Sequence, residues 1–358
     1  MPPLPVEIIE FVFALLLDHQ SLYTLLFVSH QFHAIAEPLL YADVSFELDS
    51  HPPSHFLSDD FLLAAGMCFL RTITALTNGR CGRHVQRLDL PAIAFMEHAY
   101  ESCFRSILQH LPNLRHLRVE SAEDLHGFLN FSPIPASLLR LSWFAEQEFL
   151  SPELFTQFID DQPFLEHLHT PWVFKPLTLI RQSSLEHLRV LHVYITIAPS
   201  ILFGRHITHL KIEGSAAAND AAWEALDTGA LKNIVVLVAR NVRVEYLSSS
   251  VLSRMPTLER LELDSPLLYY NSASELVHGI IVLKPQRLRH LRLYGLGASS
   301  SHHRIANAFT AVPSLSCISI YTGFTTVSSS HYYMYDVFFR TTTAVRRRVP
   351  ESSVSQWW

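Results

Sequence analysis

The chain has 358 residues, of which 49% are hydrophobic and 17% charged, and it contains 23 Phe, 12 Tyr and 5 Trp. This composition excludes intrinsic disorder as the dominant state and allows two or three domains or one long repeat array. Residues 1–70 contain nine Asp and Glu but no Lys or Arg. Because a phosphate-binding surface needs clustered cations, the charge pattern argues against a nucleic acid partner.

The cysteines and the N-terminal apolar run indicate a cytoplasmic or nuclear protein. The cysteines are widely spaced and form no CxxC pair, which is typical of free thiols in a reducing compartment. The run Phe11–Leu17 follows Glu7 and Glu10 instead of the cations of a signal peptide. At seven residues it is far short of the roughly 20 that span a bilayer. We therefore expect no membrane partner.

Residues 1–45 predict three short helices. Pro5 and Glu7 suit the first turn of a helix, and Ser21 and Ser29 are candidate N-caps of a second and a third. Pro38 is expected to end the third helix. The apolar residues at helical spacing are Ile8, Ile9, Val12, Phe13, Leu15, Leu16, Leu22, Leu25, Leu26, Phe32, Ile35 and Ala36. Such a small unit needs a partner or a neighbouring domain to be stable.

This segment resembles an F-box. The matching motifs are Leu4-Pro5, Glu7-Ile8-Ile9, Leu22-x-x-Leu25, Val28-Ser29-x-x-Phe32 and the fungal-type ending Pro38–Tyr41. The segment departs from the family in a short turn between the first two helices. It also has His30, Gln31 and His33 where basic residues are common, which lowers the expected complementarity to an acidic adaptor.

The resemblance implies docking to a Skp-family adaptor, and through it to a cullin. The implied contact residues are Leu4, Pro5, Ile8, Ile9, Leu22, Leu25, Val28, Ser29 and Phe32. The alternative is an unrelated helical cap that closes one end of a repeat array.

A degenerate L-x-x-L-x-L pattern recurs along the rest of the chain. From Leu88 to Ile318 there are nine intervals over 230 residues, within the roughly 20–29 residues of a leucine-rich repeat. One register is ambiguous, because 188–193 fits the pattern as well as 185–190. The copies lie at 85–90, 114–119, 138–143, 165–170, 185–190, 207–212, 234–239, 258–263, 288–293 and 315–320.

The predicted fold class is α/β: a three-helix F-box followed by a leucine-rich-repeat solenoid with a parallel concave sheet and convex helices. Amphipathic stretches at 100–111, 153–160 and 304–311 are candidates for the convex helices. The resemblance to F-box proteins with leucine-rich repeats spans residues 1–325. The alternative prediction is a mixed α/β domain with Leu-rich strands. The predicted domains are an F-box-like domain at 1–45, a linker and capping helix at 46–80 (helix 61–76), the solenoid at 81–325, and a C-terminal cap with a loose tail from Arg346 at 326–358.

Outward strand positions form the candidate target-binding face. They mix both signs of charge with aromatic and imidazole groups, which suits a protein epitope. The candidates are His116, Arg118, His209, Lys211, Arg260, Glu262, His290, Arg292 and Tyr294. Five histidines occupy one repeat position: His116, His167, His187, His209 and His290. They are interpreted as a repeated surface residue and not as a metal site.

The sequence contains no motif that is typical of a nucleophilic, phosphate-binding or zinc site. We therefore expect no enzyme activity, no catalytic residue, no cofactor and no metal. The resemblance implies the substrate-recognition subunit of a Skp–cullin–F-box ubiquitin ligase, with an unidentified target protein on the repeat sheet. The rival interpretation is a protein–protein interaction scaffold whose helical segment only caps the array.

Overall fold

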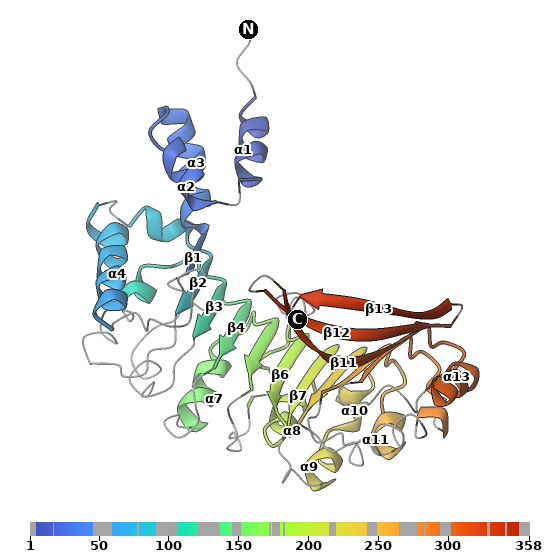
Figure 1. Cartoon of the computed structure of the whole chain (residues 1–358). Coiled ribbons are helices and arrows are strands. Elements are labelled where there is room, and N and C mark those ends of the chain that lie inside the picture. The colour runs from blue at the N-terminus through green and yellow to red at the C-terminus, as the bar shows by residue number, and fades with distance from the viewer. Residues whose placement is uncertain are drawn as a thin grey trace. The chain divides into compact units, whose positions relative to one another are not determined.

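The computed structural model (Figure 1) shows a mixed α/β protein in which most neighbouring strands are parallel. The described residues fall into two compact units, Met1–Leu165 and Glu166–Trp358. At this level the predicted α/β class is confirmed. The structure describes residues 5–16, 18–45, 59–76, 79–90, 103, 106–119, 137–144, 152–171, 173, 180–181, 183–214, 220–241, 249–264, 278, 280–282, 284–293, 302–327, 330–340 and 342–350.

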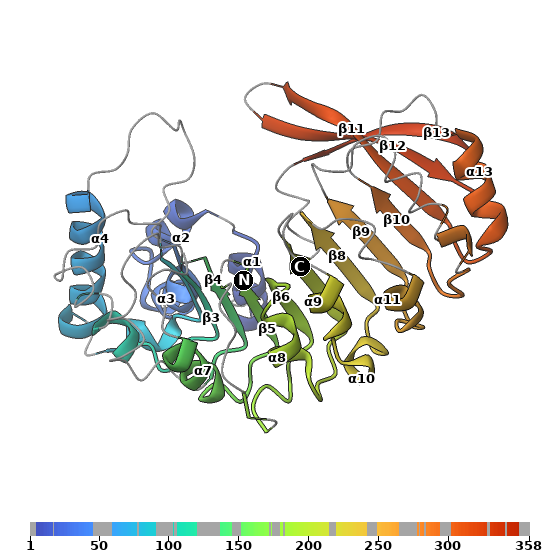
Figure 2. The same ribbon diagram turned by 90° about the horizontal axis from the view of Figure 1, so that it is seen from below.

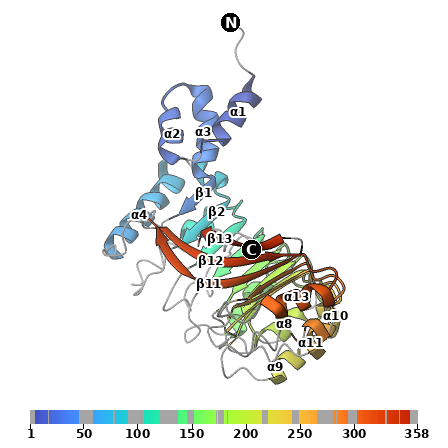
Figure 3. The ribbon, with the colours of Figure 1, turned by 45° about the vertical axis from the view of Figure 1, so that its right-hand side comes forward.

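The first unit begins with three helices, which we call the helical head: α1 (Val6–Ala14), α2 (His19–Leu25) and α3 (His30–Ala42). Both α1 and α2 pack on α3 (Figure 3). Phe13, Leu22, Ile35 and Ala36 form the buried centre of the head. The Phe32 ring meets the Phe13 ring edge-on, with the centroids 5.1 Å apart. The three predicted helices are therefore present.

Two predicted helix ends of the head are wrong. The second helix is capped by Asp18, whose Oδ1 accepts a hydrogen bond from the Ser21 backbone N–H at 2.6 Å, and Ser21 lies inside the helix. A carboxylate at this position also favours the helix N-terminus electrostatically. The third helix is capped by Ser29, as expected, but it continues through Pro38. Leu39 and Leu40 beyond the proline pack against the centre of the head, which stabilises the last turn.

The first unit continues into parallel strands. Its elements are β1 (Asp43–Ser45), α4 (Asp59–Arg71), a π-helical turn (Thr72–Leu76), the 3₁₀ helix η2 (Cys81–His84), β2 (Arg87–Leu90), β3 (His116–Val119), β4 (Arg140–Trp143) and α7 (Pro152–Asp160). Neighbours pair in the order β1-β2-β3-β4. The helix predicted at 61–76 corresponds to α4 and the turn after it. Strand β1 directly continues the helical head, so the head contributes the first strand of this sheet.

The second unit continues with parallel strands and short helices. Its strands are β5 (His167–Thr170), β6 (Val190–Tyr194), β7 (His209–Glu213), β8 (Val236–Arg240), β9 (Arg260–Asp264), β10 (His290–Leu293), β11 (Cys317–Val327), β12 (Ser330–Phe339) and β13 (Thr342–Pro350). Its helices are α8 (Ala198–Leu202), α9 (Asp220–Glu224), α10 (Thr228–Leu231), α11 (Ser249–Ser253) and α13 (His302–Ala311). Helices α8, α10 and α11 lie on one side of strands β6–β9 (Figure 2).

Alternate strand residues of the second unit form the core beneath these helices. On each of strands β6 to β10 a leucine at the second position is at most 1% exposed, as in Leu191, Leu210 and Leu291. In-register parallel pairing aligns these leucines from strand to strand. Because side chains alternate along a strand, the residues on either side of each leucine belong to the second face of the sheet.

The structure decides the one strand register that the sequence left open, and it corrects the prediction for the C-terminal tail. Strand β6 starts at Val190, so the 188–193 alternative holds and the 185–190 register does not. At the C-terminus, β12 pairs antiparallel with β11, and β13 pairs antiparallel with β12. The tail that was expected to be loose from Arg346 is thus in β13 up to Pro350, held by hydrogen bonds to β12. Residues 351–358 lie outside the described part.

None of the helices in the described ranges is long and apolar enough to cross a membrane.

Candidate functional site

Exposed apolar side chains concentrate in the helical head. Of the twelve large hydrophobic residues that are exposed in the described part of the chain, eight lie between residues 6 and 28. Isolated exposed hydrophobic residues need no explanation, but a cluster of this kind marks an interaction surface. The eight are Val6, Ile8, Phe11, Val12, Leu15, Tyr23, Phe27 and Val28.

Helix α1 is apolar on two sides. Phe13 and the half-buried Ile9 pack into the centre of the head. The other side carries Ile8, Phe11, Val12 and Leu15, which are 47, 66, 49 and 62% exposed. Residues three and four apart lie on the same side of a helix, so these four form one continuous strip. We call Ile8, Phe11, Val12 and Leu15 the α1 face.

A second exposed group lies at the end of α2. The Tyr23 and Phe27 rings meet edge-on with their centroids 5.1 Å apart, and they are 52 and 72% exposed. The neighbouring Val28 is 59% exposed. Aromatic groups with this exposure are typical anchors of a protein interface. We call Tyr23, Phe27 and Val28 the α2 patch.

The predicted adaptor contacts differ in how exposed they are in the structure. Pro5, Ile8 and Val28 are exposed and accessible to a partner, and Ser29 is exposed while it caps α3. Among the predicted adaptor contacts, Leu22 lies in the buried centre of the head and is 5% exposed. Ile9, Leu25 and Phe32 are half-buried against the centre of the head, and Leu4 lies outside the described residues.

The sequence prediction missed four of the five most exposed large hydrophobic residues of the head: Phe11, Leu15, Tyr23 and Phe27. The many apolar residues of α1, which is charged only at Glu7 and Glu10, could have revealed Phe11 and Leu15, because a helix that packs on one neighbour cannot bury apolar residues on every side.

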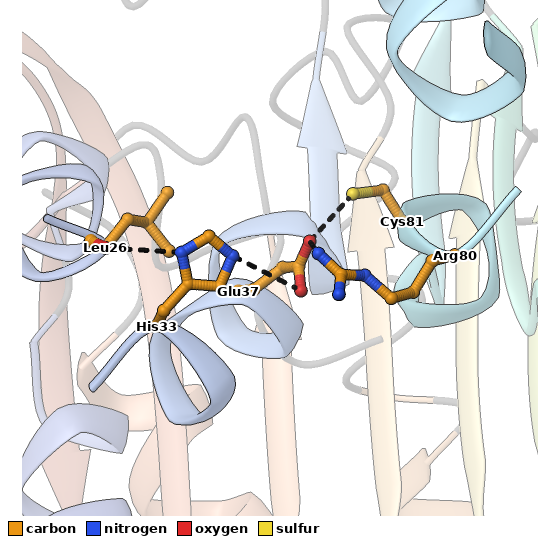
Figure 4. Close-up of polar contacts among 5 residues, drawn as sticks. All are labelled: Leu26, His33, Glu37, Arg80 and Cys81. Carbon is orange, nitrogen blue, oxygen red and sulfur yellow. Dashed lines mark hydrogen bonds and ion pairs between the residues drawn. The ribbon is translucent and has the colours of Figure 1, made fainter. Parts of the chain in front are cut away.

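A buried carboxylate attaches the head to the strands of the first unit (Figure 4). Glu37 of α3 has a side chain only 8% exposed, and its Oε1 lies 2.9 Å from an Arg80 guanidinium nitrogen and 3.1 Å from the Cys81 thiol. Its Oε2 lies 3.8 Å from His33 Nε2. The pKa of Tyr41 is raised above its ordinary value. Burial is the largest cause, and the nearby Cys81 and Glu37 raise the pKa further. We call Glu37, Arg80 and Cys81 the α3 anchor.

Backbone contacts reinforce the α3 anchor. The Gln86 N–H donates to the Ala42 carbonyl at 2.9 Å, and β1 pairs with β2 from Asp43 onward. Arg87 Nη1 also lies 3.5 Å from an Asp43 carboxylate oxygen. The helical head and the strands of the first unit are therefore joined by side-chain and main-chain bonds.

On the second face of the second unit, one carboxylate gathers several cationic and imidazole groups. Glu213 Oε1 accepts a hydrogen bond from His192 Nε2 at 2.9 Å. The Lys211 ammonium and an Arg240 guanidinium nitrogen each lie 3.9 Å from the same oxygen. The His169 ring stacks on the His192 ring with 4.0 Å between centroids. These groups come from four successive strands, β5 to β8, which in-register pairing brings side by side.

Burial controls the protonation of His192. The pKa of His192 lies well below its ordinary value, mainly because burial removes water from its ring. The charges of His169, Lys211 and Arg240 lower it further. The ring is therefore neutral near pH 7 and donates its Nε2 proton to Glu213. Neither His192 nor His169 was among the predicted target-binding residues, and the 185–190 copy of the repeat pattern ends before His192.

A second carboxylate-centred cluster lies on β9 and β10. Glu262 is 4% exposed, and its Oε2 accepts hydrogen bonds from Arg260 at 3.2 Å and from Arg292 at 3.1 Å. The pairing of β9 with β10 places Glu262 directly beside Arg292. Both arginines were predicted to be outward-facing, and both are half-buried.

The remaining predicted target-face residues divide between the two units. His116 and Arg118 belong to β3 of the first unit, whereas His209 and His290 open β7 and β10 of the second. Burial is the main cause that lowers the pKa of His116, His209 and His290. Tyr294 lies outside the described residues. His187 precedes β6 and is exposed, so the predicted five-histidine row is broken at that copy.

The described residues contain no group of three His, Cys, Asp or Glu side chains placed to hold a metal ion. A shallow polar pocket at the start of β9–β11 is lined by Glu259, Gln286, Arg287, Arg289 and Ser314. Its Arg289–Glu259 pair is 3.9 Å apart, and its two side chains are 63 and 39% exposed, so water screens it.

Comparison with known proteins assigns no family. No protein-family model matches the chain, and no curated protein matches it. Among solved structures it is similar to a PfkB family carbohydrate kinase from Listeria grayi DSM 20601. That match has 8% sequence identity and a TM-score of 0.23, and it covers 74% of this chain and 65% of the kinase chain.

No enzyme activity was predicted from the sequence, whereas this match is to an enzyme. We withdraw that prediction. At a TM-score of 0.23 the likeness assigns neither a kinase fold nor kinase activity to this chain.

Proposed function

We propose that this chain is the substrate-recognition subunit of a Skp–cullin–F-box ubiquitin ligase. The helical head docks a Skp-family adaptor and through it a cullin, and the second face of the strands holds a target protein. The ligase would then act on the target by proximity. The F-box motifs of residues 4–41 and the leucine-rich-repeat pattern that follows are the basis of this proposal.

The observation that carries the proposal is the exposed apolar surface of the head. The α1 face and the α2 patch together expose seven large hydrophobic residues over 21 positions, from Ile8 to Val28. Each such group loses unfavourable contact with water on association, at roughly 25 cal/mol per Å² before the costs of binding are subtracted. A docking helix bundle with apolar anchors on its outer side is what the F-box resemblance requires.

The second face of the second unit supports the target-binding part of the proposal. The clusters around Glu213 and Glu262 hold Arg, Lys and His side chains in place through hydrogen bonds and ion pairs. Preorganised arginines lose less entropy on binding and are common at the centres of protein interfaces. These clusters are our candidates for the target contact.

The adaptor contact can be tested with substitutions that spare the core of the head. Phe11→Ala with Leu15→Ala removes the two most exposed residues of the α1 face. We expect this variant to bind a Skp-family adaptor at least tenfold more weakly, about 1.4 kcal/mol, in calorimetry on purified proteins. Phe164→Ala with Phe203→Ala, at 53 and 52% exposure outside the head, is the matched control and should bind normally. Wild-type protein that binds no adaptor would refute the proposal.

A second candidate function is a protein–protein interaction scaffold in which the head only caps the first strand. The observation that favours it is the α3 anchor, together with the pairing of β1 with β2. A cap uses the side of the head that faces the strands and leaves the α1 face without a role. Unchanged target capture by the Phe11→Ala, Leu15→Ala variant, with no adaptor binding by the wild type, would favour the scaffold.

A further inference from the structure

The C-terminal strands of the second unit form an antiparallel ribbon whose last strand, β13, has an open outer edge. Strand β13 ends the sheet order, and among the described strands it pairs with β12 alone (Figure 1). It is nine residues long. The N–H and C=O groups along an edge strand that point away from the sheet are unpaired, and native proteins often keep such strands very short. Strand β13 is therefore a long template for one more strand.

The ribbon is basic, although the net charge of the chain is −6. Residues 317–350 contain four Arg, no Lys and one acidic residue, Asp336. Three of the four arginines are the successive β13 residues Arg346–Arg348, and Asp336 is the register partner of the first of them. The fourth, Arg340, donates hydrogen bonds to backbone carbonyls outside the ribbon. The edge strand thus carries an excess of positive charge.

Alternation along β13 produces a basic row and a mostly apolar row. Arg346 and Arg348 are two residues apart, so they belong to one face of the ribbon. Val345 and Val349 belong to the other face, with Arg347 between them. A strand added beside β13 would meet the basic row on one face and the apolar row on the other. A segment that alternates acidic and apolar residues matches both rows.

We propose that the outer edge of β13 binds an extended acidic segment of a partner protein, which adds to the sheet as one more strand. In strand addition the backbone hydrogen bonds supply affinity, and alternate side chains supply specificity. Opposite charges directly across two strands stabilise the pair. This contact does not involve the helical head, so it goes beyond the proposed function and does not depend on adaptor binding.

The arginines of β13 argue against two other occupants of its edge. Two copies of this chain paired antiparallel through β13, centred on Arg347, would bring the two runs Arg346–Arg348 opposite each other, and like charges in that position are destabilising. The phosphates of a nucleic acid match the charge, but a phosphate backbone has no N–H groups to donate to the edge carbonyls. An acidic protein segment satisfies both the charge and the hydrogen-bonding groups.

Strand addition can be tested with synthetic peptides and the intact chain. The probe is a fluorescently labelled peptide of alternating Glu and Val that is as long as β13, and its binding is measured by fluorescence anisotropy. Two further peptides carry backbone N-methyl groups either on every Glu or on every Val, and a third has Gln in place of each Glu. The test variant of the chain is Arg346→Gln with Arg348→Gln. The control, Arg287→Gln with Arg289→Gln, removes the same charge at exposed sites of the same unit.

We expect the probe to bind and one of the two N-methylated peptides to bind at least about tenfold more weakly, while the other binds like the probe. The reason is that the N–H groups of alternate residues point to opposite edges of a strand, so only one set donates to β13. The Gln peptide and the test variant should each weaken binding about fivefold, and the control variant should not.

Equal affinities of the two N-methylated peptides would overturn strand addition and reduce the contact to charge attraction. A probe that does not bind would also overturn the proposal, as would an oligothymidylate that binds more tightly than the probe. A chain that dimerises through β13 in light scattering would replace the partner segment with a second copy. None of these results requires the adaptor, so the proposed function stands or fails separately.

Discussion

Replacing Glu37 with glutamine is expected to loosen the attachment of the helical head to the strands of the first unit. The substitution keeps the shape of the side chain and removes its charge. It weakens the bond from Arg80 at 2.9 Å and the contact with the Cys81 thiol at 3.1 Å. The change acts only on the α3 anchor, since Glu37 is directed toward η2 and away from the exposed α1 face.

The magnitude follows from the burial of the two partners. A hydrogen bond to a buried charged group contributes about 1.5–3 kcal/mol. The Arg80 side chain is 60% exposed, so water screens its charge. The contribution of the ion pair to stability is therefore about 1 kcal/mol. A thiol is a weak donor and adds less than a neutral hydrogen bond. We therefore expect about 1.4 kcal/mol in total, or roughly a tenfold increase in the opening of α3.

Hydrogen-exchange mass spectrometry measures this opening directly, because it resolves local stability along the chain. Peptides across α3 and η2 should exchange faster in the variant, and peptides across α7 of the same unit should not change. Arg80→Ala should have a comparable effect, and the double variant should lose less than the sum of the two single variants, because the residues act as a pair. Unchanged protection of α3 in Glu37→Gln would refute the argument.

Three further predictions concern buried positions of the two units. Leu291 is 1% exposed, so Leu291→Asp should destabilise the second unit by several kcal/mol in urea denaturation, whereas His290→Asp should leave it nearly unchanged; equal damage would contradict the alternation of buried and outward residues. The pKa of His192 is lowered by folding, so the unfolded chain takes up its proton near pH 6.5 before the folded chain does, and stability should fall as the pH drops below about 6.5. His192→Asn should flatten that decline, and an unchanged pH profile would place the titrating group elsewhere. A Cβ on Gly82 would lie 2.3 Å from the His110 carbonyl oxygen, so Gly82→Ala should lower the melting temperature of the first unit, and a wild-type melting curve would show that this contact can relax.

Most of the parallel strands follow from local sequence patterns. Nine of the ten L-x-x-L-x-L copies contain a strand at the predicted position, since each supplies two leucine-like residues at a spacing of two that can only be buried together on one face. Helices α7 and α13 end at Asp160 and Ala311, shortly before Pro163 and Pro313, because a proline disfavours helical backbone in the residue that precedes it.

The register of β6 could not be chosen from the sequence, because both overlapping copies carry the same apolar pattern. The structure selects the second copy through backbone geometry. Leu185 has a φ of 62°, in the left-handed region, and so cannot belong to a strand. The Arg189 and Val190 N–H groups then both donate to the Glu166 carbonyl, the same arrangement that opens β3 and β7. Such long-range bonds are invisible to a local pattern.

The spacing of the apolar residues also could not predict which side of α1 is exposed. The helix is apolar at positions 6, 8, 9, 11, 12 and 13, so a count of apolar residues at helical spacing fits more than one side. The packing of Phe13 against Phe32 decides which side is buried, and that contact joins two helices of the head. The candidate docking surface was thus predicted in the correct segment but with several of its most exposed residues missing.

The most direct test of the account is hydroxyl-radical footprinting of the wild-type chain with and without a Skp-family adaptor. Free chain should be modified strongly at Phe11 and Phe27, which are 66 and 72% exposed, and at Phe164 and Phe203, which are 53 and 52% exposed. We predict that the adaptor protects Phe11 and Phe27 and leaves Phe164 and Phe203 as reactive as in the free chain. Equal modification of Phe11 and Phe27 in the two samples, under conditions where the adaptor is bound, would contradict the assignment of the helical head as the docking surface.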